Sequence, residues 1–164
     1  MTPKLAPHDV SEIIDSTLQR TAKILRNHSV RLDLATDVPM ISVDAVLFEQ
    51  VLFNLLDNAA KYSPEGTTIR IQGWRDQDAV CLQVLDEGNG IPPAELEHIF
   101  DKFYRVEKGD QVRAGTGLGL AISRGFVEAM RGSITAANRT DRSGAAFMTR
   151  LPVPPSAGQL DTAA

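Results

Sequence analysis

Glycine alternates with other residues in segment 113–123, immediately before an apolar run with helical spacing. The three glycines are Gly115, Gly117 and Gly119. Glycine loses more conformational freedom on folding than any other residue, so its repeated use indicates that bare backbone is needed there. The start of a helix presents unpaired amides that favour an anion such as phosphate. Taken alone, the segment fits a phosphate-binding loop and an ordinary glycine-rich turn equally well.

The common nucleotide-binding loops do not match this segment. Leu120 stands where the Rossmann pattern requires glycine and where a Walker loop requires its Gly-Lys pair to begin. The glycine loop of protein kinases fails at the same position. A nucleotide site built on these glycines would therefore belong to another architecture.

A polar arc follows one side of the helix that we predict over residues 44–62. At about 100° per residue, five polar positions share roughly a third of the circumference. They are Gln50, Asn54, Asp57, Asn58 and Lys61. Asparagine is a poor helix former, and neutral oxygen ligands beside a lysine suit Mg²⁺ and the phosphates it carries. The solvated face of an amphipathic helix would give the same pattern.

A second pair of alternating glycines follows the apolar run that ends at Asp86. Gly88 and Gly90 have the spacing of the first glycine segment. A carboxylate at the end of a strand can accept a hydrogen bond from an exocyclic amine while a flat ring lies against the glycines. Because aspartate and glycine are common in turns, a plain turn is the alternative interpretation.

Composition narrows the class of protein. The chain has 164 residues, a hydrophobic fraction of 43% and a formal net charge of −4, which are typical of one soluble domain and not of a nucleic-acid-binding protein. With one cysteine, Cys81, the chain forms no internal disulfide and no cysteine-cluster metal site. We expect no direct membrane contact from this chain, since no apolar run is long enough to span a bilayer.

Hydrophobic periodicity predicts alternating helices and hairpins. We expect helices over 10–26, 44–62, 92–100 and 118–130, and a mobile loop over 101–116. Strands are expected within 29–44, where Pro39 separates two of them, and over 67–74, 79–86, 133–138 and 144–152. No βαβ unit is obvious, which favours an α/β fold with helices on one face of a largely antiparallel sheet. The tail, residues 154–164, is too polar to pack and is predicted to be disordered.

Four short segments, in this order, resemble a known family. "NLLDNAAKY", "DEGNGI", "FDKFYR" and "GTGLGL" are similar to the N, G1, F and G2 boxes of sensor histidine kinases, whose superfamily includes the gyrase B, HSP90 and MutL ATPases. The resemblance covers about residues 8–153 and is greatest to KdpD-type potassium-sensor kinases. It implies a Bergerat α/β sandwich over residues 1–153, in which a lid over about 101–116 closes on ATP.

The resemblance also implies roles for individual residues. Asn54, Lys61 and Arg105 would serve catalysis, Asn58 would ligate Mg²⁺, and Asp86 would accept the adenine amino proton. Phe100 and Phe103 would anchor the lid. The residues expected around the nucleotide are Asn54, Asn58, Lys61, Tyr62, Asp86, Gly88, Gly90, Ile91, Phe103, Arg105, Gly115, Thr116, Gly117, Leu118, Gly119 and Leu120.

One position separates the kinases from the hydrolysing relatives. Those relatives carry a glutamate, their general base, where this chain has Asn54, and asparagine has no useful basicity. None of His8, His28 and His98 stands in the acceptor motif of a histidine kinase. The acceptor histidine would thus come from a separate dimerisation domain, and a response regulator would receive the phosphoryl group. An ATP-hydrolysing domain and a degenerate nucleotide-binding interaction module are the alternatives.

The same resemblance implies a cellular setting. The domain is expected to be cytoplasmic, in a parent kinase that is anchored in the inner membrane.

Overall fold

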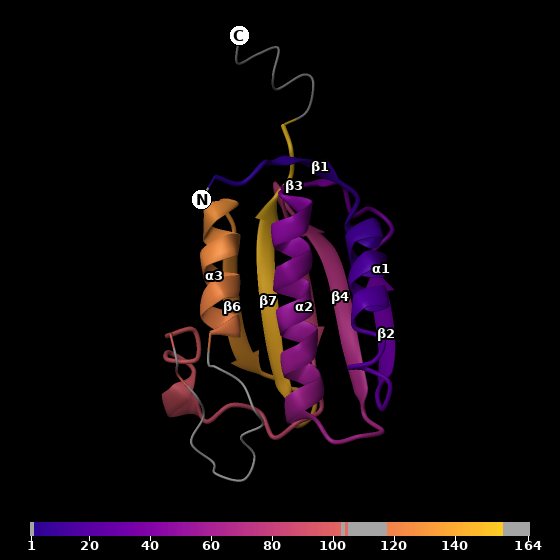
Figure 1. The fold of residues 1–164 in the computed structure, drawn as a ribbon, viewed down its shortest axis with the longest axis vertical. Helices are drawn as coiled ribbons and strands as arrows, with labels where there is room; N and C mark the ends of the chain where they lie inside the picture. The colour runs from indigo at the N-terminus through magenta and orange to yellow at the C-terminus, as the bar shows by residue number, and fades with distance from the viewer. Residues whose placement is uncertain (1, 103, 105–117, 156–164) are drawn as a thin grey trace.

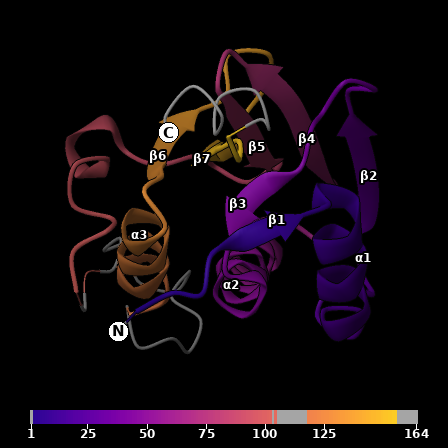
Figure 2. The ribbon, with the colours of Figure 1, turned by 90° about the horizontal axis from the view of Figure 1, so that it is seen from above.

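The computed structural model describes residues 2–102, 104 and 118–155. Its elements are β1 (Ala6–His8), α1 (Val10–Arg20), β2 (Ser29–Leu34), β3 (Ile41–Val43), α2 (Ala45–Tyr62), β4 (Thr68–Asp76), β5 (Ala79–Leu85), the 3-10 helix η1 (Pro93–Glu95), α3 (Gly119–Ala129), β6 (Ser133–Asn138) and β7 (Ala145–Pro152). Within these residues, α1, α2 and α3 lie side by side on one face of a five-stranded sheet (Figure 1). Figure 2 shows the two layers from above. The predicted two-layer α/β fold is confirmed.

The sheet is mixed and mainly antiparallel. Its strand order is β2-β4-β5-β7-β6, and β2 runs parallel to β4 while the other neighbours are antiparallel. The connection from β2 to β4 passes through β3 and α2, so it is a crossover. This strand–helix–strand unit is not obvious in the sequence, because β3 intervenes between β2 and α2 and hides the spacing. Strand β1, which the sequence pattern did not predict, pairs with β3 in a separate two-stranded sheet.

The central helix α2 lies between α1 and α3 and packs on β4 and β5 (Figure 1). Its N-cap, Asp44, accepts hydrogen bonds from the amides of Val46 at 3.1 Å and Leu47 at 3.3 Å. Such a cap stabilises a helix by about 1 kcal/mol. The face that α2 buries consists of Phe48, Val51, Leu52, Leu55, Leu56, Ala59 and Ala60.

Strand register aligns apolar side chains beneath the helices. Ile71 on β4 is paired with Val84 on β5, which is paired with Phe147 on β7. All three are buried in one hydrophobic cluster with the inner face of α2. Burying each such side chain contributes about 1.5–3 kcal/mol. The core therefore fixes the outer face of α2 relative to the ends of the strands.

Helix α1 is shorter than the predicted 10–26. It ends at Arg20, and turns follow over residues 21–27. The Thr21 hydroxyl donates to the carbonyl oxygens of Thr17 at 2.9 Å and Leu18 at 3.4 Å, which occupies acceptors of the last helical turn. Leu25 is nevertheless buried, so its periodicity identified a core position and not a further helical turn.

The helix predicted over 92–100 is a 3-10 turn followed by irregular turns. Only Pro93–Glu95 is helical, and the amides of Glu95 and His98 donate to carbonyls three residues earlier, at 2.8 and 2.9 Å. Because these amides bond three residues back and not four, the segment winds as short 3-10 turns and not as an α-helix. The helix predicted over 118–130 is confirmed as α3, and Cys81 is buried as expected.

Candidate functional site

The polar arc of α2 faces the start of α3. Asn54 Nδ2 donates to the Gly119 carbonyl oxygen at 3.2 Å and to Ser123 Oγ at 3.1 Å. Asn54 Oδ1 accepts from Gln50 Nε2 at 2.9 Å. These bonds join the asparagine of the helical arc directly to the end of the glycine segment. Two of the segments singled out in the sequence therefore lie side by side.

The far end of the arc presents a lysine and an amide. Lys61 Nζ lies 2.9 Å from Asp57 Oδ2, in an ion pair one helical turn apart. Asn58 lies between them, half-buried, and within the described chain no hydrogen bond engages its side chain. Its amide oxygen is a hard neutral ligand of the kind that Mg²⁺ accepts.

Asp86 lies directly after β5, and its side chain is only partly satisfied by the protein. One oxygen, Oδ1, accepts from the amides of Gly88 at 2.9 Å and Ala145 at 3.1 Å. Within the described residues, Oδ2 accepts no hydrogen bond. It is also not one of the buried side-chain atoms without a partner, so it remains accessible. The site thus holds one oxygen of the carboxylate by two amides and leaves the other for a donor.

Burial raises the pKa of Asp86, because an ionised carboxylate loses hydration in a site where the residue is 4% exposed. The amides of Gly88 and Ala145 and the charge of Arg139 oppose this rise. The surroundings thus perturb the pKa of this carboxyl, which follows the central strand β5, and groups with perturbed pKa values concentrate at functional sites.

The glycines after Asp86 allow a close approach between the turn and α2. A Cβ at Gly88 would collide with the Tyr62 carbonyl oxygen at the end of α2. Gly90 has φ +78°, and a Cβ there would lie 2.6 Å from Asn138 Oδ1. Both positions therefore require glycine. The Asp86 turn meets the end of the α2 arc through these contacts.

Three further predicted residues flank this turn or begin α3. Ile91 is buried, Leu118 is the N-cap of α3, and Leu120 packs against the core. Tyr62 is 40% exposed at the end of α2, which leaves its ring accessible beside the turn. Phe100 packs edge-to-face on Phe147, at 6.3 Å between ring centroids, and so fixes the segment that precedes the predicted lid.

Several predicted site residues lie outside the described residues. They are Phe103, Arg105, Gly115, Thr116 and Gly117. The predicted lid, 101–116, lies outside them too, apart from residues 101, 102 and 104.

Sequence reasoning missed the residues that hold the Asp86 turn from the far side. Asn138, at the end of β6, accepts from the Ile91 amide at 2.6 Å and donates to the Ile91 carbonyl at 2.7 Å. Ser143 Oγ donates to the Gly88 carbonyl at 2.7 Å. The sequence pattern predicts a strand on each side of this segment and gives the link between them no further role. The clustering of Asn, Arg, Asp and Ser in so short a link was the one available signal, and it is also typical of turns.

A separate pocket of about 330 Å³ lies at the opposite end of β5, beside the β4–β5 turn. It is lined by Asp78, Ala79, Arg131, Gly132, Ser133, Arg150, Leu151 and Pro152. None of the predicted site residues contributes to it. Among the described residues, no three His, Cys, Asp or Glu side chains gather to hold a metal ion, and no helix is long and apolar enough to cross a membrane.

Sensor histidine kinases are among the proteins that this chain resembles in sequence and in fold. The chain is 42% identical over 144 residues to the sensor protein KdpD of Clostridium acetobutylicum, and 41% identical over 143 residues to KdpD of Escherichia coli. Each alignment covers 87% of this chain but only 16% of the relative, so the chain spans about a sixth of the length of these relatives. The solved structure of the mycobacterial sensor histidine kinase MprB is 28% identical and superposes with a TM-score of 0.80, covering 93% of this chain and 100% of that one.

The family profile covers most of the sandwich. Residues 43–155 match the family described as "Histidine kinase-, DNA gyrase B-, and HSP90-like ATPase". That span begins with the last residue of β3 and includes α2, the Asp86 turn, α3 and the hairpin of β6 and β7. The chain belongs to the histidine kinase-, DNA gyrase B- and HSP90-like ATPase family.

Proposed function

We propose that this chain is the catalytic ATP-binding domain of a two-component sensor histidine kinase. It binds Mg-ATP and transfers the γ-phosphoryl group to a histidine on a separate dimerisation domain. The observation that supports this most directly is the divided hydrogen bonding of Asp86. Oδ1 is held by two backbone amides, while Oδ2 is left to accept a hydrogen bond from the exocyclic amine of adenine.

The arc of α2 would hold the phosphates. Asn58 would ligate Mg²⁺ through its amide oxygen, and the remaining ligands would be phosphate oxygens and water, as this ion prefers. When bound, Mg²⁺ neutralises charge that develops on the phosphates. Lys61 would add charge from α2, Arg105 from the predicted lid, and the glycine segment 115–119 would add backbone amides at the start of α3.

Asn54 favours phosphoryl transfer over hydrolysis. Its amide is held on both sides, by Gln50 on α2 and by Gly119 and Ser123 on α3, and it cannot take a proton from water. A histidine acceptor is itself a nucleophile, so the domain needs positioning and charge neutralisation more than a general base. Neither the hydrolase nor the degenerate-module alternative gains support from the described residues.

The proposed kinase would contain further domains besides this one. The elements run from Ala6 to Pro152, which supports one domain over residues 1–153 with a tail over 154–164. The chain covers only 16% of the KdpD relative, which supports a larger parent protein. We infer that this parent is anchored in the inner membrane and that the domain is cytoplasmic. A response regulator would then accept the phosphoryl group from the histidine.

Transfer in trans tests this proposal. The chain is mixed with the dimerisation domain of the same protein and with ATP labelled in the γ-phosphate. The proposal expects acid-labile, base-stable label on a histidine of the dimerisation domain, and no label when that histidine is replaced by glutamine. Steady release of phosphate at the same rate with and without the acceptor would instead favour a hydrolase.

A further inference from the structure

The turn between β6 and β7, residues 139–144, contacts the Asp86 turn. Besides the Ser143 bond to Gly88, Arg142 Nη1 lies 3.2 Å from Glu87 Oε2. Gly144 has φ +146°, and a Cβ there would collide with the Asp86 carbonyl oxygen. The two turns are therefore in backbone contact, and the β6–β7 turn determines where Asp86 can lie.

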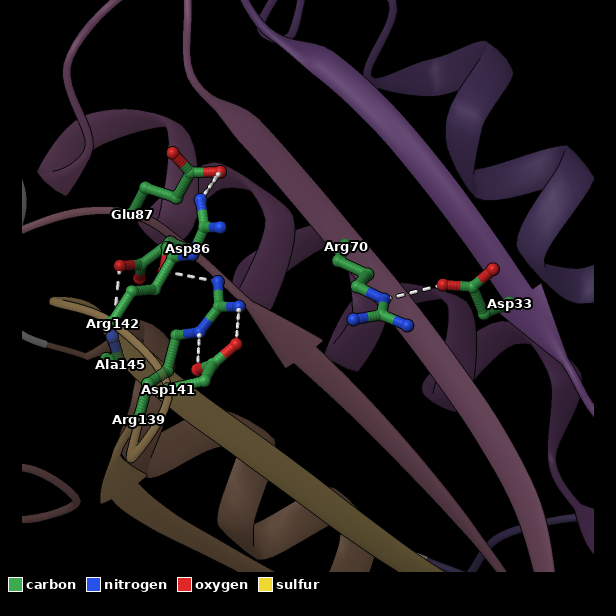
Figure 3. Close-up of polar contacts among 8 residues, drawn as sticks. All are labelled: Asp33, Arg70, Asp86, Glu87, Arg139, Asp141, Arg142 and Ala145. Carbon is green, nitrogen blue, oxygen red and sulfur yellow. Dashed lines mark hydrogen bonds and ion pairs between the residues drawn. The ribbon is translucent and has the colours of Figure 1, made fainter.

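Arg139 is the buried charge of this contact. Its side chain is 5% exposed, and Nη1 donates to the Asp86 carbonyl oxygen at 3.1 Å. Its Nε and Nη2 donate to the two carboxylate oxygens of Asp141 at 3.0 and 2.9 Å. Figure 3 shows the guanidinium between Asp86 and Asp141. A forked pair of this kind fixes the guanidinium plane, so its third bond is aimed at the Asp86 backbone.

The charge of Arg139 also acts on the Asp86 carboxylate. Burial raises the pKa of that group, and Arg139 is the charged residue that lowers it. The other charged side chains on the adjoining elements are paired: Glu87 with Arg142, Asp141 with Arg139, and Asp57 with Lys61 on α2. Arg139 is thus placed to keep Asp86 both fixed and ionised.

We infer that Arg139 is a positioning residue for adenine recognition: it holds the backbone of Asp86 and supplies the charge that keeps its carboxylate an acceptor. This rests on the proposed function, in which Asp86 accepts the adenine amino proton. Arg139 itself is engaged by Asp86 and Asp141, so it acts through Asp86 and not by touching the nucleotide.

The matched variants are R139Q and R142Q. Both remove one positive charge from the same turn, but only Arg139 bonds Asp86, since Arg142 pairs with Glu87. Exposure differs as well, because Arg142 is largely exposed. A general effect of charge or of turn stability would appear in both variants, whereas positioning of Asp86 would appear in R139Q alone.

The first readout needs no nucleotide. The carboxyl carbon of Asp86 is titrated by NMR in the intact chain, and the exchange rates of the Gly88 and Ala145 amides are measured. R139Q should shift the Asp86 titration to higher pH and speed exchange of the two amides about tenfold, the change expected when a charged hydrogen bond is lost. R142Q should leave both unchanged. An unaltered titration and unaltered exchange in R139Q would overturn the inference.

The second readout is nucleotide affinity. R139Q should weaken binding of a non-hydrolysable ATP analogue about tenfold at pH 7, and this loss of affinity should grow as the pH falls. R142Q should weaken binding less than about twofold. Failure of the parent chain to bind the analogue would contradict the proposed function, while the titration would still decide the inference. If R139Q does not fold, D141N replaces it, because Asp141 is exposed and its carboxylate fixes the Arg139 guanidinium. Unchanged exchange of the Gly88 and Ala145 amides in D141N would equally overturn the inference.

Discussion

The carbonyl oxygen of Tyr62, the last residue of α2, lies against Gly88 in the turn after β5. A Cβ at position 88 would collide with that oxygen and would come within 3.2 Å of Asp86 Oδ1. The polar arc of α2 and the carboxylate of Asp86 are thus held in one place by a contact that has no room for a side chain. In the proposed function, the phosphate end and the adenine end of one nucleotide would both rely on this contact.

Gly88→Ala should disrupt that contact. The added methyl group forces the turn away from α2, at a cost of about 1–3 kcal/mol in the free energy of unfolding, which is typical of overpacking against a fixed backbone. Displacement of Asp86 should weaken binding of an ATP analogue about tenfold or more. Thermal unfolding and calorimetry measure the two effects.

Gly125→Ala is the control for this change. Gly125 is exposed on α3, and a Cβ there meets no atom within 4 Å. Replacing it should stabilise the chain by about 0.5–1 kcal/mol, because alanine favours a helix, and should leave affinity unchanged. Equal affinities of the two alanine variants would show that the Tyr62–Gly88 contact does not position the site.

Much of the fold could be predicted because periodicity reports burial. The helix over 44–62 and the strands around Asp86 have strong patterns, and the structure places them as expected. The end of α1 could not be predicted, since the apolar spacing continues to the buried Leu25 although the helix ends at Arg20. The crossover between β2 and β4 was hidden for a similar reason: pairing partners are set by the tertiary fold and not by any local pattern.

The candidate site, like the fold, could be predicted only in part from the sequence. Asn54 and Asp86 could be selected from the sequence because polar residues at helical spacing and an aspartate after a strand are unusual enough to need explanation. Asn138 and Arg139 could not, because a polar turn between strands is ordinary until its partners are known. Their role arises from contacts with residues about 50 positions earlier, namely Asn138 with Ile91 and Arg139 with Asp86.

Asn54→Ala should loosen the start of α3. The side chain loses its bonds to Gln50, Gly119 and Ser123, which should lower the free energy of unfolding by about 1–2 kcal/mol. Because the glycine segment is proposed to hold phosphate, affinity for ATP should fall while affinity for adenosine changes little. Calorimetry with both ligands separates the two parts of the site.

Ser123→Ala serves as the control for Asn54→Ala. It removes one acceptor of the Asn54 amide and keeps the bond to Gly119, so a smaller loss of ATP affinity is expected. If Asn54→Ala weakened adenosine and ATP binding equally, the link between Asn54 and the phosphate end of the site would be wrong.

Asn58→Ala should abolish the magnesium dependence of nucleotide binding. The variant loses the proposed protein ligand but keeps Lys61 and Asp86, so binding in the presence of EDTA should match that of the parent chain. Calorimetry with an ATP analogue, with and without Mg²⁺, gives the two affinities. Asn27→Ala is the control, because Asn27 is exposed and its side chain bonds only Glu65, at 3.4 Å, among the described residues. A metal effect of parental size in Asn58→Ala would remove Asn58 from the ligand shell.

Asp86→Asn should separate stability from binding. Burial raises the pKa of Asp86 above the usual 3.8, so the folded state binds this proton more tightly than the unfolded state does. The contribution of Asp86 to stability is therefore greatest below pH 3.8 and is lost as the pH rises through the folded value. Asparagine does not ionise, so Asp86→Asn should be as stable as the parent chain, or more stable, at pH 7.

Nucleotide binding should depend on pH in the opposite sense. Adenine needs the ionised carboxylate as acceptor, so affinity for an ATP analogue should rise as the pH rises through the folded pKa of Asp86. Asp86→Asn presents an amide donor to the adenine amine and should lose about tenfold or more in affinity, the equivalent of roughly 1.5–3 kcal/mol for a hydrogen bond to a charged group. Purine riboside triphosphate, which lacks the amine, is the control ligand and should bind both chains with similar affinity. A loss of the same size for both ligands would mean that Asp86 supports the fold of the pocket and does not recognise the amine.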